Sequence, residues 1–140
     1  MSAVHATTVA IGNLGVMLLG SSGSGKSDLA LRLIDRGAML VSDDYTQVVV
    51  LDGALIASPP ATIAGRMEIR GIGIVAMPFT SSITVRMVVS LGDEVDRMPS
   101  PGWRTIAGQR VRAIVIDPRP ASAAIKVERA LAQIVAECGA

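Results

Sequence analysis

Short apolar runs separated by turn residues predict strands along most of the chain. The first two runs flank Gly12-Asn13, a pair suited to a hairpin turn, and Asp52-Gly53 separates a later pair. Pro59-Pro60 ends the strand that precedes it. The predicted strands are residues 7–11, 16–19, 39–41, 46–51, 55–56, 83–91 and 111–116.

Two segments show helical spacing instead. Between residues 26 and 36, Leu29, Leu33 and Ile34 recur on one helix face, and Gly37 follows where a left-handed residue commonly ends a helix. A second helix is predicted over residues 121–137, with one apolar face made of Val127, Leu131, Ile134 and Cys138. Hairpins beside a strand that leads into a helix predict a mixed sheet and not an all-parallel one.

The chain is predicted to form one domain. Its 140 residues contain no internal repeat and no low-complexity linker, so residues 1–140 are treated as a single unit. Half of the residues are hydrophobic and 18% are charged, which excludes a disordered chain. Residues 93–108 mix charge with proline and glycine and are predicted to form a long surface loop.

Charge and cysteine content limit the possible partners and compartment. The formal charge is +1, and the arginines are scattered along the chain, which argues against a nucleic-acid groove. The apolar runs are shorter than the roughly 20 residues of a membrane-spanning helix, so no membrane partner is expected. The single Cys138 cannot form an internal disulfide, and residues 1–10 lack the pattern of a secretory signal, so we expect a cytoplasmic protein.

Residues 20–27 match the phosphate-binding pattern G-x-x-x-x-G-K-[ST] at every fixed position. The motif lies between a predicted strand and a predicted helix, as its mechanism requires. Glycines let backbone N–H groups surround phosphate oxygens, Lys26 reaches the β- and γ-phosphates, and Ser27 can ligate Mg²⁺. The alternative is a turn that merely joins strand to helix. The predicted nucleotide-binding residues are Gly20, Ser21, Ser22, Gly23, Ser24, Gly25, Lys26 and Ser27.

A phosphate loop needs an acidic partner that holds a metal ion or accepts a proton. Asp43 and Asp44 end one predicted strand, and Asp117 ends another. Because side chains alternate along a strand, Asp43 and Asp44 are expected to point in different directions. One can orient an attacking hydroxyl while the other contacts Mg²⁺ or its water. A turn role is the alternative for Asp44 and the favoured interpretation for Asp117, which precedes Pro118.

Four segments resemble, in order and approximate spacing, the catalytic domain of HPr kinase/phosphorylase. They are His5, the phosphate loop, Val41-Ser42-Asp43-Asp44, and Met-Glu-Ile-Arg-Gly-Ile-Gly-Ile-Val at 67–75. The resemblance covers nearly the whole chain, and the last segment is highly specific to this family. It implies an α/β fold: a P-loop kinase domain of the phosphoenolpyruvate-carboxykinase-like type, with a mixed sheet and few helices.

The resemblance also implies an activity. Members use ATP and Mg²⁺ to phosphorylate a serine of HPr, the phosphocarrier of the sugar phosphotransferase system, and many also remove that phosphate with inorganic phosphate as acceptor. An HPr-like phosphocarrier is therefore the expected partner. Members usually carry an additional N-terminal domain and a longer C-terminal region than these 140 residues contain, and they typically form homo-oligomers, most often hexamers.

Individual residues take roles from the same resemblance. Lys26 and Ser27 are implied to hold phosphate and Mg²⁺, and Glu68 to be the second metal ligand. The pair Asp43-Asp44 is implied to contain the group that takes the seryl proton. The sequence leaves open which of the two aspartates this is.

The resemblance assigns further roles to one histidine and to two segments predicted to lie in loops. His5 matches the family's active-site histidine, Arg97 its catalytic arginine, and residues 105–110 the segment used in dephosphorylation. Three of the residues given a role by the resemblance also have an ordinary structural interpretation. His5 can be an ordinary surface histidine, Arg97 an exposed loop arginine, and Glu68 half of a solvated charge pair with Arg70.

Other functions remain open at this point. A P-loop small-molecule kinase is the nearest alternative, because several arginines could clamp a phosphorylated metabolite: Arg66, Arg70, Arg97 and Arg104. A GTP-dependent switch is disfavoured because Asn13 is the only asparagine, so the guanine-reading Asn-Lys-x-Asp sequence is not present. A non-catalytic ATP-binding module is disfavoured because the implied catalytic residues are all retained.

Overall fold

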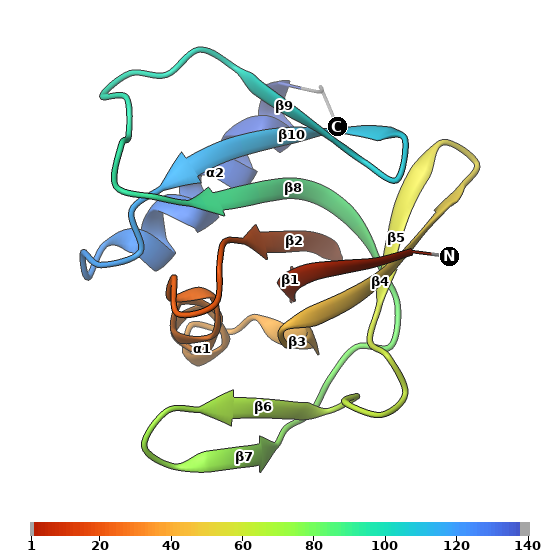
Figure 1. The fold of residues 1–140 in the computed structure, drawn as a ribbon. Coiled ribbons are helices and arrows are strands. Elements are labelled where there is room, and N and C mark those ends of the chain that lie inside the picture. Colours follow the sequence, from red (N-terminus) through yellow and green to blue (C-terminus); the bar gives the residue numbers. More distant parts are fainter. Residues whose placement is uncertain (1, 138–140) are drawn as a thin grey trace.

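A computed structural model describes residues 2–137 of the chain, which form a mixed α/β fold with two helices (Figure 1). The strands and helices follow one another as β1 (Ser2–Ile11), β2 (Leu14–Leu19), α1 (Lys26–Asp35), β3 (Met39–Ser42), β4 (Tyr45–Leu51), β5 (Ala54–Ser58), β6 (Arg66–Ile69), β7 (Gly73–Ala76), β8 (Ile83–Leu91), β9 (Gly102–Ile106), β10 (Gln109–Ile116) and α2 (Ala123–Glu137).

Eight strands form one mixed sheet in the order β2-β1-β4-β5-β8-β10-β9, with β3 paired to β1. A further pairing of β2 with β8 closes the first five of these strands into a ring. β6 and β7 form a separate hairpin, which lies beside α1 and β3 and outside the large sheet (Figure 1). The expected mixed sheet with few helices is therefore confirmed.

The strands that lead into the predicted site end at a common edge of the sheet. β8 is parallel to both β2 and β10, and β3 runs the same way as β2 because both are antiparallel to β1. In open α/β sheets, ligands bind outside the carboxyl ends of the strands. The phosphate loop, Asp43-Asp44, the segment after β8 and the segment after β10 all follow such ends.

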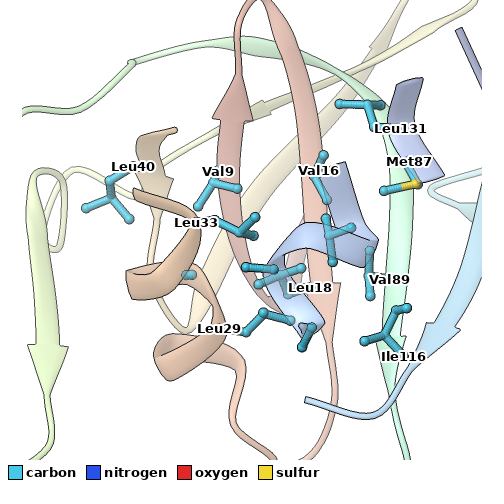
Figure 2. Packing of buried hydrophobic residues seen from close by; sticks show 14 of the residues in the cluster. Val9, Val16, Leu18, Leu29, Leu33, Leu40, Met87, Val89, Ile116 and Leu131 are labelled. Atoms are coloured by element: carbon cyan, nitrogen blue, oxygen red, sulfur yellow. The ribbon is translucent and has the colours of Figure 1, made fainter. Parts of the chain in front are cut away.

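The main hydrophobic core lies between the large sheet and both helices. Leu29 and Leu33 of α1 are fully buried and lie close to Val9, Val16 and Leu18 of the first two strands (Figure 2). Burying a leucine side chain contributes about 1.5–3 kcal/mol, so these contacts fix α1, and with it the phosphate loop, to the sheet. Within the described residues, the strands of the ring contribute most of a second buried cluster: Ala6, Met17, Leu19, Val48, Leu55, Ala57, Val85, Val88, Ile106 and Val111.

Most of the elements predicted from the sequence are present. The hairpin around Gly12-Asn13 is confirmed, and so is the first helix, after which Gly37 adopts a left-handed φ of 111°. The predicted face of the second helix is confirmed for Val127, Leu131 and Ile134, which are buried. That helix begins at Ala123 and not at residue 121, and Cys138 lies outside the described residues.

The prediction of a continuous loop over residues 93–108 is wrong. Residues 102–106 form the edge strand β9, which pairs antiparallel with β10. The strand carries few apolar side chains, and Trp103 is held by the guanidinium groups of Arg110 and Arg112, which lie 4.0 and 5.3 Å from its ring centre. These contacts come from the partner strand and leave no periodic pattern in the local sequence.

Candidate active site

The phosphate loop joins β2 to α1 and depends on two of its glycines. Gly25, which caps the N-terminus of α1, has a left-handed φ of 101°, a conformation that other residues rarely adopt. At Gly20, an added Cβ would lie 2.4 Å from Ser24 Oγ, so a larger residue would collide with the Ser24 side chain inside the loop. The glycines therefore keep the backbone tightly wound in front of the helix N-terminus, where anions are stabilised.

Lys26 crosses this loop and is 5% exposed. Its Nζ donates hydrogen bonds to the carbonyl oxygens of Gly20 at 2.7 Å and Ser21 at 3.1 Å. In the described part of the chain, no carboxylate lies within ion-pair distance of Lys26. A buried ammonium without a negative partner is costly, so the loop is suited to an anionic ligand.

Asp43 is buried at the centre of the site and has a donor on each carboxylate oxygen. Its Oδ1 accepts from Ser27 Oγ at 2.6 Å and from Thr7 Oγ1 at 3.1 Å, and its Oδ2 accepts from the backbone N–H of Glu68 at 3.1 Å. The carboxylate thereby connects β1, α1 and β6. A phosphate-loop serine next to such a carboxylate is the pair that P-loop enzymes use to hold Mg²⁺.

Asp44 turns the other way, toward solvent. It has a left-handed φ of 70°, and its Oδ1 lies 2.9 Å from His5 Nε2. The His5 ring stacks on Tyr45, with ring centres 5.0 Å apart and planes at 24°. The expectation that the two aspartates point apart is confirmed. The cause is the bend after β3, which ends at Ser42, and not alternation along a strand.

Thr7 and Tyr45 belong to this site and were not predicted from the sequence. Thr7 Oγ1 donates to Asp43 Oδ1 and accepts from the backbone N–H of Asp44 at 3.1 Å, so one hydroxyl positions both aspartates. Both residues also favour strands, and nothing in their local sequence distinguishes a positioning role from an ordinary strand position. The pairing of His5 with Tyr45 across β1 and β4 was the missing information.

Glu68 lies on β6, and the buried Met67 attaches that strand to the main core. The segment after the hairpin is also tied to β3, where Leu40 O accepts from Thr80 N at 2.8 Å. The Glu68 backbone contacts Asp43, while its side chain is exposed. Glu68 and Arg70 form no ion pair with each other, so the charge-pair interpretation has no support from the structure.

Arg97 and residues 105–110 belong to segments at opposite ends of the parallel strands β8 and β10. Arg97 is exposed in the segment after β8, which leaves the sheet at the edge of the phosphate loop. Residues 105–110 span the turn between β9 and β10, where β10 begins. Val115 of β10 and Leu19 at the end of β2 both pair with Ser90 of β8, so these two residues lie at the same level of the sheet. Arg110 lies five residues before Val115, which places it about 16 Å along the strands from the end of β2. The structure does not bring residues 105–110 to the phosphate loop.

Asp117 follows β10 at the site edge and forms a local turn, as predicted. Its Oδ1 accepts from the backbone N–H of Arg119 at 3.0 Å. The Arg119 guanidinium also donates to both oxygens, at 3.0 and 2.9 Å. The side-chain and backbone hydrogen bonds from Arg119 lower the pKa of Asp117 from its ordinary value of 3.8 to about 2.

The described residues lack a cluster of metal-ligating side chains and a helix that could span a membrane. Residues 2–137 contain no group of three or more His, Cys, Asp or Glu side chains arranged to hold a metal ion. In the same range, neither helix combines the length and apolar character needed to cross a membrane. A divalent cation would therefore need ligands besides these side chains, such as the oxygens of a bound phosphate.

Comparisons with known proteins agree on one family. Residues 1–98 match the family described as "HPr Serine kinase C-terminal domain". The chain is 41% identical over 75 residues to HPr kinase/phosphorylase of Clostridium tetani, covering 54% of this chain and 25% of that protein. It is 43% identical over 72 residues to HPr kinase/phosphorylase of Clostridium botulinum (strain Eklund 17B / Type B), covering 51% of this chain and 24% of the relative.

A solved structure extends the likeness to the complete fold. The HPr(Ser) kinase/phosphatase from Coxiella burnetii superposes with a TM-score of 0.85 at 28% identity, and the match covers 100% of both chains. The segments matched to the two clostridial relatives span about a quarter of those proteins' length.

Proposed function

Because the chain belongs to the HPr serine kinase C-terminal domain family, we propose that it transfers the γ-phosphoryl group of ATP to a serine of HPr or an HPr-like carrier. The observation that carries this proposal is the pair of adjacent aspartates at the mouth of a phosphate loop. One is buried against the loop serine, and the other is exposed beside a histidine. The buried aspartate can help to hold Mg²⁺, and the exposed aspartate can accept the seryl proton.

The residues present fit a nucleotide and Mg²⁺. Ser24 Oγ is buried and has no hydrogen-bond partner in the described structure, and Lys26 has carbonyl partners only. Phosphate oxygens would satisfy both groups. Ser27 and Asp43 would hold Mg²⁺, with Glu68 close by as a further ligand. When bound, the ion neutralises negative charge on the β- and γ-phosphates.

We assign the proton acceptor to Asp44. Both oxygens of Asp43 already accept hydrogen bonds from protein donors, and the residue is buried, which leaves little of its carboxylate open to a protein substrate. Asp44 is exposed, and His5 Nε2 donates to it when the carboxylate is ionised, which fixes the carboxylate's direction. Tyr45 holds the imidazole by stacking and acts as a positioning residue.

The transfer then follows from these positions. The seryl oxygen forms a bond to the γ-phosphorus, the bond from that phosphorus to the β–γ bridging oxygen breaks, and the seryl proton passes to Asp44. Lys26 binds the phosphates throughout, and Arg97 lies on the segment at the same edge. In the reverse direction, Asp44 returns the proton to the serine oxygen while inorganic phosphate takes the phosphoryl group and forms pyrophosphate.

A transfer assay tests the proposal. The protein is incubated with Mg·ATP and purified HPr-like carriers, and mass spectrometry locates any phosphate on the carrier. Phosphate on one serine is expected. Phosphate on small metabolites but on none of the carriers would favour a small-molecule kinase and would contradict the proposal. The seryl-phosphorylated carrier is then incubated with inorganic phosphate alone, where release of pyrophosphate is the expected sign of the reverse reaction.

The proposal includes the setting in which the enzyme works. Charge and cysteine content lead us to expect a cytoplasmic protein with no nucleic-acid partner, and the family resemblance implies a homo-oligomer. Sedimentation of the purified protein measures the number of subunits directly. A sedimentation coefficient of a monomer over the working concentration range would contradict the oligomeric part of the proposal.

A further inference from the structure

A cavity of about 460 Å³ lies beside the phosphate loop, outside the aspartate cluster. Gly23 and Gly25 line it from the loop, Arg32 from α1, and Pro118 and Arg119 from the segment after β10. Cavities of about 300–1,000 Å³ are typical of small-ligand sites. The proposed chemistry of phosphoryl transfer uses none of the side chains that line it from α1 and the segment after β10.

Arg119 presents a flat, fixed cation at this cavity. Its backbone N–H, Nε and Nη2 donate to Asp117 at 3.0, 3.0 and 2.9 Å, and these hydrogen bonds hold the guanidinium in one plane. The Arg119 side chain is nevertheless 73% exposed, so a face of the guanidinium is accessible. Because Asp117 already balances its charge, Arg119 is better suited to stacking on an aromatic ring than to binding a phosphate.

Arg32 connects the segment that contains Arg119 to α1, the helix that follows the phosphate loop. Its Nη2 donates to Pro118 O at 2.6 Å, and its Nη1 donates to Pro120 O at 3.2 Å. Asp28, one turn earlier on α1, lies 3.0 Å from the same guanidinium. Pro118 also approaches the loop itself, since an added Cβ at Gly25 would lie 3.4 Å from its Cγ. These contacts hold the segment that carries Arg119 against α1 and the phosphate loop.

We propose that this cavity binds the base and ribose of a purine nucleotide whose phosphates lie in the loop, with the base stacked on the Arg119 guanidinium. The inference rests on the proposed use of a nucleotide. A second cavity of about 520 Å³, lined by Leu31, Asp35, Arg36 and Ile125 among others, includes no phosphate-loop residue. Because loop residues line only the first of these two cavities, a nucleotide held by the loop would place its base there.

Binding measurements with two phosphate ligands test the subsite. Titration calorimetry in the presence of Mg²⁺ compares ATP with inorganic tripolyphosphate, which has no base or ribose. Arg119→Ala is expected to weaken ATP by about tenfold, an ordinary value for loss of one stacking contact. Tripolyphosphate affinity should stay within about twofold. The matched control is Arg129→Ala, an exposed arginine of α2 that does not line the cavity, and it should change neither affinity.

Other outcomes separate the possible failures. Equal losses for ATP and tripolyphosphate would make Arg119 a phosphate ligand and overturn the subsite, as would an unchanged ATP affinity. Asp117→Asn keeps the arginine but removes the carboxylate that holds its guanidinium in place. This variant is expected to lose more affinity for ATP than for tripolyphosphate, and equal losses would contradict stacking of the base on Arg119. If the unmodified protein binds neither ligand, nucleotide use itself fails. If it binds both but phosphorylates no carrier, only the proposed substrate fails.

Discussion

At the scale of single residues, hydrogen-bond donors surround Asp43 while solvent reaches Asp44. Two adjacent carboxylates in the same environment would be equally suited to hold the metal ion or to accept the proton. Here Thr7 and the bend after β3 give them different environments, and His5 adds a partner to the exposed one. The division of labour proposed for the two aspartates therefore depends on residues that do not react.

Tyr45 provides a test of this dependence. Tyr45→Ala removes the ring on which His5 stacks, and we expect kcat to fall by about tenfold to a hundredfold because the imidazole is no longer held against Asp44. Tyr45→Phe keeps the ring and should restore the rate. His5 is the only histidine, so its ¹⁵N imidazole resonances report the hydrogen bond to Asp44 without ambiguity.

A purely structural role for Tyr45 would have a different result. Tyr45→Ala would then lower the melting temperature while leaving the imidazole resonances and kcat of the folded protein unchanged. The same resonances in Tyr45→Phe should match those of the unmodified protein.

At the scale of elements, the β6–β7 hairpin brings Glu68 to the site although it lies outside the large sheet. Met67 is 1% exposed and is its anchor in the main core, while Ile72 in the hairpin turn is 76% exposed. Met67→Ala is expected to lower the free energy of unfolding by about 2–5 kcal/mol, because it leaves a cavity. Urea unfolding measures this change.

Ile72→Ala is the matched control on the same hairpin. Its effect on the free energy of unfolding should stay within about 0.5 kcal/mol, because the side chain is already in solvent. Equal effects of the two substitutions would mean that the hairpin is not anchored through Met67.

The segment after β10 adds a dependence on pH. Arg119 holds the pKa of Asp117 at about 2, below its ordinary value of 3.8. A depressed pKa means that the pair contributes its full stability above the ordinary value, and that this contribution is lost as the pH falls toward 2. The difference in stability between the unmodified protein and Asp117→Asn should therefore be constant above about pH 5 and shrink on acidification. Unfolding measured across this range checks it, and a difference that grew on acidification would be inconsistent with the ion pair.

At the scale of the whole molecule, the parts that the sequence predicts are those governed by local pattern. The phosphate loop, the first hairpin and both helices have strong periodic or glycine signals, and each is present. Strand β9 was missed because its stability comes from pairing with β10 and from arginines stacked on Trp103. The placement of residues 105–110 at the far edge depends on strand order, which no local pattern reveals.

The candidate site shows the same limit. The sequence supplies Lys26, Ser27 and the two aspartates, and the structure brings them together with His5 and Glu68. Which aspartate faces the loop serine and which faces solvent depends on a bend and on Thr7, so it could not be read from the sequence.

The most direct test of the proposed mechanism is single-turnover transfer from Mg·ATP to a carrier serine by Asp43→Asn and Asp44→Asn, each measured over a range of Mg²⁺ concentrations. Asp44→Asn should bind Mg·ATP normally and transfer about a hundredfold to ten-thousandfold more slowly at every Mg²⁺ concentration, because it cannot accept the seryl proton. Asp43→Asn should require more Mg²⁺ and recover part of its rate as Mg²⁺ rises. Full activity of Asp44→Asn, or recovery of that variant by Mg²⁺, would contradict the assignment of Asp44 as the proton acceptor.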